Sequence, residues 1–204
     1  MTDTRARITE FGNAFGWPWV AVKFHRETPE AKPRDMRFCE ALKEALSSPV
    51  VLTAGSVGCP GAMRSFGWAG ESDEGLAKDM AEKQGLPVAT AKKMIGGVPK
   101  LDCGVVAVEV GTRETPDVLL SYAQAPTAMK IARAIEKGSG EAPRPVLSSV
   151  MSACGNAAVR SHLTGELAIS FGCDQSREAG DIGRDRLVIG MPWERVSELL
   201  GTMQ

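Results

Sequence analysis

Five cysteines carry the most distinctive chemistry of this 204-residue chain: Cys39, Cys59, Cys103, Cys154 and Cys173. Thiolates bind soft metals and, when their pKa is lowered, act as nucleophiles. No two of these cysteines form a CxxC pair, which argues against zinc-ribbon, thioredoxin-like and bacterial ferredoxin sites. Because the chain has only two histidines, a mixed Cys/His zinc site has little support. The odd number and long spacings also argue against a disulfide framework.

The surroundings of the cysteines separate them into two groups. Cys39 lies on the apolar face of a predicted helix and Cys103 precedes a run of valines, so packing alone explains both. Cys59, Cys154 and Cys173 lie in loops of glycine and other small residues, which offer little for a packed thiol to contact. The residues alone leave two interpretations open, a metal or cluster site and a set of buried structural thiols.

Two stretches that contain a cysteine resemble each other. Residues 49–62 read Pro, a short apolar strand, then Cys-x-x-Ala, and residues 145–157 repeat this order. An Arg-Ser pair follows in each copy. The pattern predicts a cysteine at each strand–loop–helix junction, where backbone N–H groups and the positive end of a helix stabilise a thiolate.

Hydrophobic periodicity predicts strands that alternate with helices along the chain. The predicted strands cover residues 19–24, 50–53, 105–110, 118–122, 146–150, 167–171 and 187–190. The predicted helices cover residues 4–15, 35–47, a segment from 61, 73–84, 87–95, 126–137, 154–163 and 192–200. This alternation indicates the α/β class, with a layered, mostly parallel or mixed sheet and flanking helices.

The predicted organisation is a single domain over residues 1–204. It contains two pseudo-repeated β-loop-α-β-α halves, at about 18–70 and 116–165. A helical hairpin, predicted as a lid, is inserted at 71–97, and a strand–helix unit at 166–204 ends the chain.

Composition limits the functional classes. The formal net charge is −1 and the predicted pI is about 6.2, so a basic nucleic-acid-binding face is not expected. No apolar run approaches the ~18 residues of a membrane-spanning helix, and the charged start is unlike a signal peptide. We therefore expect a cytoplasmic protein with reduced thiols and no membrane partner. The sequence leaves a homo-oligomer open.

Several short motifs, taken in order, resemble the DUF169 family. They are residues 37–42 (RFCEAL), 56–62 (SVGCPGA), 152–154 (SAC), 171–177 (FGCDQSR) and 188–192 (VIGMP). DUF169 comprises uncharacterised proteins found largely in anaerobic bacteria and archaea. The resemblance spans nearly the whole chain, and the order and separation of the motifs make it specific.

The resemblance implies a ligand set. The characteristic cysteine positions of the family match Cys39, Cys59, Cys154 and Cys173, and Cys103 lies outside this set. Four thiolates in a family common in anaerobes imply an iron–sulfur cluster of the [4Fe–4S] type. Zinc or copper(I) is the alternative cofactor.

Glycines and arginines beside the cysteines are the remaining candidates. The backbone N–H groups of three glycines are predicted to bond to cluster sulfurs: Gly58, Gly61 and Gly155. Three arginines follow the cysteines and would balance the charge of a cluster or bind an anionic substrate: Arg64, Arg160 and Arg177. Ordinary surface arginines are the alternative for these three.

These residues support more than one function. The first is a cluster protein with a redox or small-substrate role and an unidentified redox partner. The alternative is a non-catalytic binding module for a soft metal, a metallocofactor or a small anion. An enzyme with a cysteine nucleophile is disfavoured because neither His25 nor His162 has a recognisable partner in the sequence. Whether the protein is an enzyme stays open.

Overall fold

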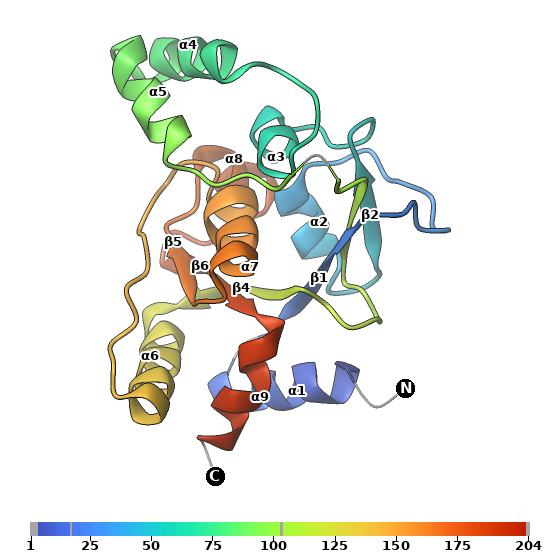
Figure 1. Cartoon of the computed structure of the whole chain (residues 1–204), viewed down its shortest axis with the longest axis vertical. Coiled ribbons are helices and arrows are strands. Elements are labelled where there is room, and N and C mark those ends of the chain that lie inside the picture. The colour runs from blue at the N-terminus through green and yellow to red at the C-terminus, as the bar shows by residue number, and fades with distance from the viewer. Residues whose placement is uncertain (1–3, 17, 103, 203–204) are drawn as a thin grey trace.

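A six-stranded sheet forms the centre of the computed structural model, which describes residues 4–16, 18–102 and 104–202 (Figure 1). Cys103 therefore lies outside the described residues. The strand order is β2-β3-β1-β4-β6-β5, and every neighbouring pair in it is antiparallel. The strands are β1 (Val20–His25), β2 (Val50–Thr53), β3 (Ala107–Val110), β4 (Val118–Gln124), β5 (Ala168–Ser170) and β6 (Arg186–Pro192).

The α/β class with flanking helices is confirmed, but the predicted parallel or mixed pairing is wrong. Strands β1 and β2 do run parallel with a helix between them, as a β-α-β alternation predicts. They are not neighbours, however, because β3 enters later and pairs antiparallel with both. Strand β6 separates β4 from β5 in the same way. In each half of the sheet, the two parallel strands are therefore separated by one strand that is antiparallel to both: β3 lies between β1 and β2, and β6 lies between β4 and β5.

The predicted halves, 18–70 and 116–165, are not confirmed as a repeat. The order β2-β3-β1 on one side of the sheet mirrors β5-β6-β4 on the other. This order relates β1, β2 and β3 to β4, β5 and β6, so the second unit extends to the end of β6. The short helix after β2 then corresponds to the one after β5.

Helices cover both faces of the sheet. One core contains residues of α2 (Phe38–Glu44), α3 (Pro60–Ser65) and the π-helix η1 (Ser152–Val159), packed on β1, β2 and β3 and on part of β4 and β6. The other core contains residues of α1 (Thr4–Phe15), α6 (Ala125–Ser139) and α9 (Trp193–Gly201). The two remaining short helices are α7 (Arg160–Thr164) and α8 (Asp174–Ala179).

The predicted hairpin is confirmed as α4 (Asp73–Gln84) and α5 (Val88–Gly96), which project from one end of the molecule (Figure 1). The Ser72 hydroxyl caps α4 by accepting from the N–H of Gly75, and Gly85 ends it in the left-handed conformation. The hairpin has a small core of its own, against which Met151 from the body packs.

The segment between α6 and α7 differs most from the prediction. Residues 146–150 were expected to form a strand, but they have no strand partner and lead directly into η1. Residues 154–163 were expected to form one helix, and they divide between η1 and α7. All eight residues of η1 are buried. Small side chains allow this, and at Gly190 of β6 a Cβ would lie 2.4 Å from the Ala157 oxygen.

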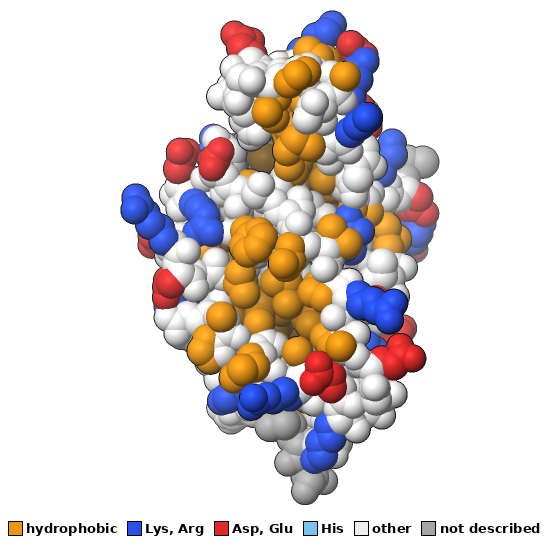
Figure 2. All heavy atoms as spheres, turned by 90° about the vertical axis from the view of Figure 1, so that its left-hand side faces the viewer, with side chains coloured by type: hydrophobic (Ala, Val, Ile, Leu, Met, Phe, Trp, Pro, Cys, Tyr) orange, Lys and Arg blue, Asp and Glu red, His pale blue; other side chains and the backbone are white. Residues whose placement is uncertain are grey.

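Hydrophobic side chains gather on the face that carries α6 and β5 (Figure 2). Met129 of α6, Val146 and Leu147 of the connecting segment, and Phe171 after β5 are 45–55% exposed. Among the described residues, no helix combines the length and apolar character needed to cross a membrane.

Candidate metal centre

Each of the four predicted cysteine ligands lies at or near the start of a helix. Cys59 and Cys173 are the N-cap residues of α3 and α8. Cys39 is the second residue of α2, and Cys154 is the third of η1. Helix N-termini carry unpaired N–H groups and partial positive charge, which stabilise a sulfur that becomes negative.

Cys39 and Cys173 meet where α2 packs against α8. The Cys39 thiol lies 3.6 Å from the carbonyl oxygen of Gln175, which is two residues beyond Cys173. The Cys173 thiol in turn lies 3.4 Å from the Ser176 hydroxyl. Gly180 closes this corner, since a Cβ there would lie 3.1 Å from the Cβ of Cys39.

Cys59 and Cys154 meet where α3 packs against η1. The Ser65 hydroxyl lies 3.6 Å from the Cys154 sulfur and 3.8 Å from the Met151 sulfur. A Cβ at Gly61 would lie 3.8 Å from the Cys59 sulfur and 3.1 Å from Cγ of Met151. Met151 therefore lies between the two cysteines and the helical hairpin.

Electrostatics joins the two pairs into one group. Burial raises the pKa of Cys39 to about 12, and negative charge on Cys173 and then Cys59 adds to the rise. Burial also raises the pKa of Cys154, with Cys59 and Cys173 contributing. Because each buried thiol senses a cysteine of the other pair, all four share one electrostatic environment. Tyr122 borders it, since burial and then Cys39, Cys173 and Cys154 raise its pKa.

The thiols are free and not yet arranged around a common point. Cys39, Cys59, Cys154 and Cys173 are all unbridged. Among the described residues, no group of three or more Cys, His, Asp or Glu side chains is positioned to hold a metal ion. With their raised pKa values, Cys39 and Cys154 are protonated at neutral pH. Metal binding at these residues would release protons, so affinity would rise with pH.

The sequence model of DUF169, a family described as "Uncharacterised ArCR", matches residues 16–201. The chain belongs to the DUF169 family. The resemblance inferred from the cysteine motifs is thus confirmed over nearly the whole chain. No curated protein and no solved structure gives a significant match.

The glycines of this DUF169 member differ in what surrounds them. The backbone N–H of Gly155 donates to the Met151 carbonyl oxygen at 2.9 Å, and the Gly155 backbone lowers the pKa of Cys154 against the larger effect of burial. Gly155 also permits close packing, since a Cβ there would lie 2.3 Å from Val98 and 2.9 Å from the Ser65 hydroxyl. A Cβ at Gly58 would have its nearest contact at 3.9 Å. Bonds from Gly58, Gly61 and Gly155 to a cluster stay a prediction.

Arg64 and Arg160 both bind carbonyl groups where the chain returns from the hairpin. Arg64 forms a two-point ion pair with Asp73, at 2.8 and 3.1 Å, and donates to the Val98 oxygen. Arg160 donates to the Gly97 oxygen at 2.8 Å and to the side chain of Asn156. Both arginines therefore fasten the hairpin to the body, and their predicted contact with a cofactor or anion is not tested.

Arg177 holds the loops on either side of α8. Its guanidinium donates to the carbonyl oxygens of Phe171 and Gly183. These contacts fix the backbone that leads into Cys173 and out of the helix. Its predicted role toward an anion is also untested.

Replacing Arg64 with Met is expected to loosen the hairpin. Arg64 is buried whereas Asp73 is half exposed, so the variant loses a charged hydrogen-bond network and leaves the Val98 oxygen without this donor. A loss of about 1–3 kcal/mol in unfolding free energy should follow, with faster proteolysis within residues 71–97. Lys83→Met removes an exposed ion pair with Asp79 and should leave the unfolding free energy nearly unchanged. Equal proteolysis of both variants would contradict the fastening role.

Two features of the site escaped the sequence analysis. Met151 adopts a left-handed conformation (φ 45°) directly before η1, although nothing in its residue type indicates this. The helix α8 was also missed, because DQSREA has little apolar periodicity. Asp174 is a signal that was available, since an acidic residue in the first turn is typical of a helix start.

Proposed function

We propose that this DUF169 protein binds an iron–sulfur cluster of the [4Fe–4S] type through Cys39, Cys59, Cys154 and Cys173. The observation that carries the proposal is the packing of the helix starts that hold these cysteines: α2 packs against α8 and against η1, and α3 packs against η1. Four thiols from dispersed segments that lie on helices in contact support a common ligand set, because cysteine thiolates are the ligands that hold iron–sulfur clusters.

The donor set suits this cofactor. Sulfur is the ligand that iron–sulfur centres prefer, and carboxylates are not among the groups that shift the pKa values of Cys39 and Cys154. The backbone at Glu40 and Gly155 already lowers the pKa values of Cys39 and Cys154, against the larger effect of burial. Backbone N–H groups that bond to cluster sulfurs would raise the reduction potential of a bound cluster. Rotation of the thiols toward one another is required for four-fold ligation.

A bound cluster would supply one-electron transfer or a Lewis-acidic iron for a small substrate. The protein would contribute the thiolates, the N–H donors and a hairpin that limits water access near Met151. This role fits a reducing, cytoplasmic setting and requires a redox partner that is not identified.

A second candidate is a non-catalytic site for copper(I) or zinc. Three sulfur atoms surround one region, those of Cys59, Cys154 and the thioether of Met151. Copper(I) accepts mixed thiolate and thioether ligands, so this arrangement would suit it without the other two cysteines.

Metal analysis of protein purified without oxygen tests both candidates. Broad brown absorption with about four irons and four sulfides per chain is expected for the cluster. A colourless protein with one copper or zinc would support the second candidate. Protein that stays free of all three metals after anaerobic reconstitution with iron, sulfide, copper(I) and zinc would contradict both.

A further inference from the structure

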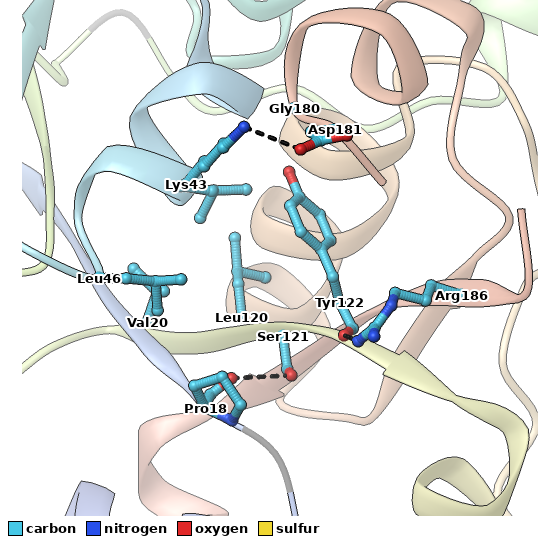
Figure 3. Close-up of a pocket in the computed structure, with 11 residues that line it drawn as sticks. Pro18, Val20, Lys43, Leu46, Leu120, Ser121, Tyr122, Gly180, Asp181 and Arg186 are labelled. Atoms are coloured by element: carbon cyan, nitrogen blue, oxygen red, sulfur yellow. Dashed lines mark hydrogen bonds and ion pairs between the residues drawn. The ribbon is translucent and has the colours of Figure 1, made fainter. Parts of the chain in front are cut away.

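A pocket of about 240 Å³ lies between α2, β4 and the loop that follows α8 (Figure 3). Its apolar wall is formed by Val20 of β1, Leu42 of α2, Leu46 in the turn after α2, and Leu120 of β4. The volume is below the ~300–1,000 Å³ typical of pockets for larger ligands, so an occupant must be small.

Charged groups stand at the opposite side of the pocket. The Lys43 ammonium lies 2.9 Å from the Asp181 carboxylate, and Arg186 donates to the carbonyl oxygen of Tyr122 at 3.2 Å. Lys43 and Asp181 thus pair at one edge of the pocket, and the Arg186 guanidinium lies at another edge, beside the Tyr122 carbonyl (Figure 3). An ammonium group has three N–H donors, so Lys43 can share them between Asp181 and an anionic ligand. The combination fits a molecule with one negative group and a short apolar chain.

The pocket shares a wall with Cys39. Lys43 follows Cys39 by four residues on α2, which places the two about one helical turn, ~5.4 Å, apart on the same side. The Tyr122 hydroxyl points toward the loop after α8 (Figure 3) and lies 3.5 Å from the Cys39 carbonyl oxygen. Gly180 lines the pocket and contacts Cys39 from the other side.

We propose that this pocket binds a small organic carboxylate with a short apolar chain, beside Cys39. The carboxylate pairs with Lys43 on the side of Arg186, and the chain lies against Leu46 and Leu120. The inference rests on the proposed function in one respect: it makes the bound carboxylate the ligand of the metal centre. Binding itself requires no metal.

The test uses butyrate as the probe and butan-1-ol as its uncharged match, in protein-observed NMR titrations of the full chain. Butyrate is expected to shift resonances of pocket residues, and butan-1-ol to bind about tenfold more weakly. Lys43→Gln should weaken butyrate binding about tenfold. Lys23→Gln is the matched control, because Lys23 forms a similar ion pair with Glu114 elsewhere, and it should leave butyrate affinity unchanged. Asp181→Asn removes the competing carboxylate and should tighten binding.

The outcomes separate this inference from the proposed function. Equal binding of butyrate and butan-1-ol, or an unchanged affinity in Lys43→Gln, would overturn the pocket assignment whatever the metal content. Protein that binds butyrate but takes up no metal on anaerobic reconstitution would sustain the pocket and remove its link to a metal centre. In metal-loaded protein, butyrate should alter the visible absorption, and an unaltered spectrum at saturating butyrate would exclude coupling to the centre.

Discussion

Replacing Cys59 or Cys154 with alanine is expected to lower the affinity for the cluster about 100-fold or more, so that anaerobically prepared protein retains much less iron than the wild type. Substitution of groups that merely support a metal ligand already costs about 10–100-fold in affinity, so removal of a ligand should cost at least as much. Because Cys154 is buried among small residues and alanine is close in shape, the fold should survive the change. Iron and sulfide content, measured beside the far-UV circular dichroism spectrum, gives the result.

The same measurement on Cys103→Ala provides the control. Cys103 is not part of the proposed ligand set, so its loss should leave the iron content at the wild-type value. If Cys59→Ala, Cys154→Ala and Cys103→Ala all kept their iron, the four-cysteine assignment would be wrong. If Cys39→Ala and Cys173→Ala alone kept their metal, the three-sulfur site around Met151 would be favoured instead.

The helices and strands were largely predictable because apolar periodicity marks them directly. Helix α1, strand β2 and helix α4 have the predicted bounds. Strand pairing was not predictable. Strands β3 and β6 each lie between two strands that precede them in the chain, and no local sequence pattern indicates this placement. The strand predicted at 146–150, which the structure lacks, shows a related limit. An apolar run indicates burial or an extended chain, but it does not show whether a partner strand is available.

The resemblance to DUF169 indicated the four candidate cysteines, and the structure shows which of them lie on helices that pack together. The sequence repeat suggested that Cys59 and Cys154 are equivalent. The strand order instead relates Cys59 to Cys173, the N-cap residues of the short helices after β2 and β5. Tyr122 and Met151 could not be inferred, because their place beside the thiols follows from packing between segments far apart in the chain.

Replacing Gly67 with alanine is expected to destabilise the protein by about 3 kcal/mol or more, and to lower its melting temperature by about 6–12 °C. Gly67 adopts φ +75°, which costs a residue with a Cβ about 1–2 kcal/mol. A Cβ there would also lie 2.5 Å from the carbonyl oxygens of Leu101 and Asp102. Backbone atoms cannot move aside as the end of a flexible side chain can. Residue 101 is also held in place, because the Leu101 N–H donates to the Ser65 oxygen at 2.8 Å.

Gly85→Ala separates the two causes. Gly85 has a similar φ of +65°, but a Cβ there would have no atom within 4 Å. This variant should lose only the conformational part of the unfolding free energy, about 1–2 kcal/mol, when both variants are unfolded in urea titrations. The excess in Gly67→Ala then measures the close approach of residues 101–102 to the end of α3, the helix that begins at Cys59. Equal losses in the two variants would show that this approach relaxes without cost, and that α3 is held by its contacts with η1 instead.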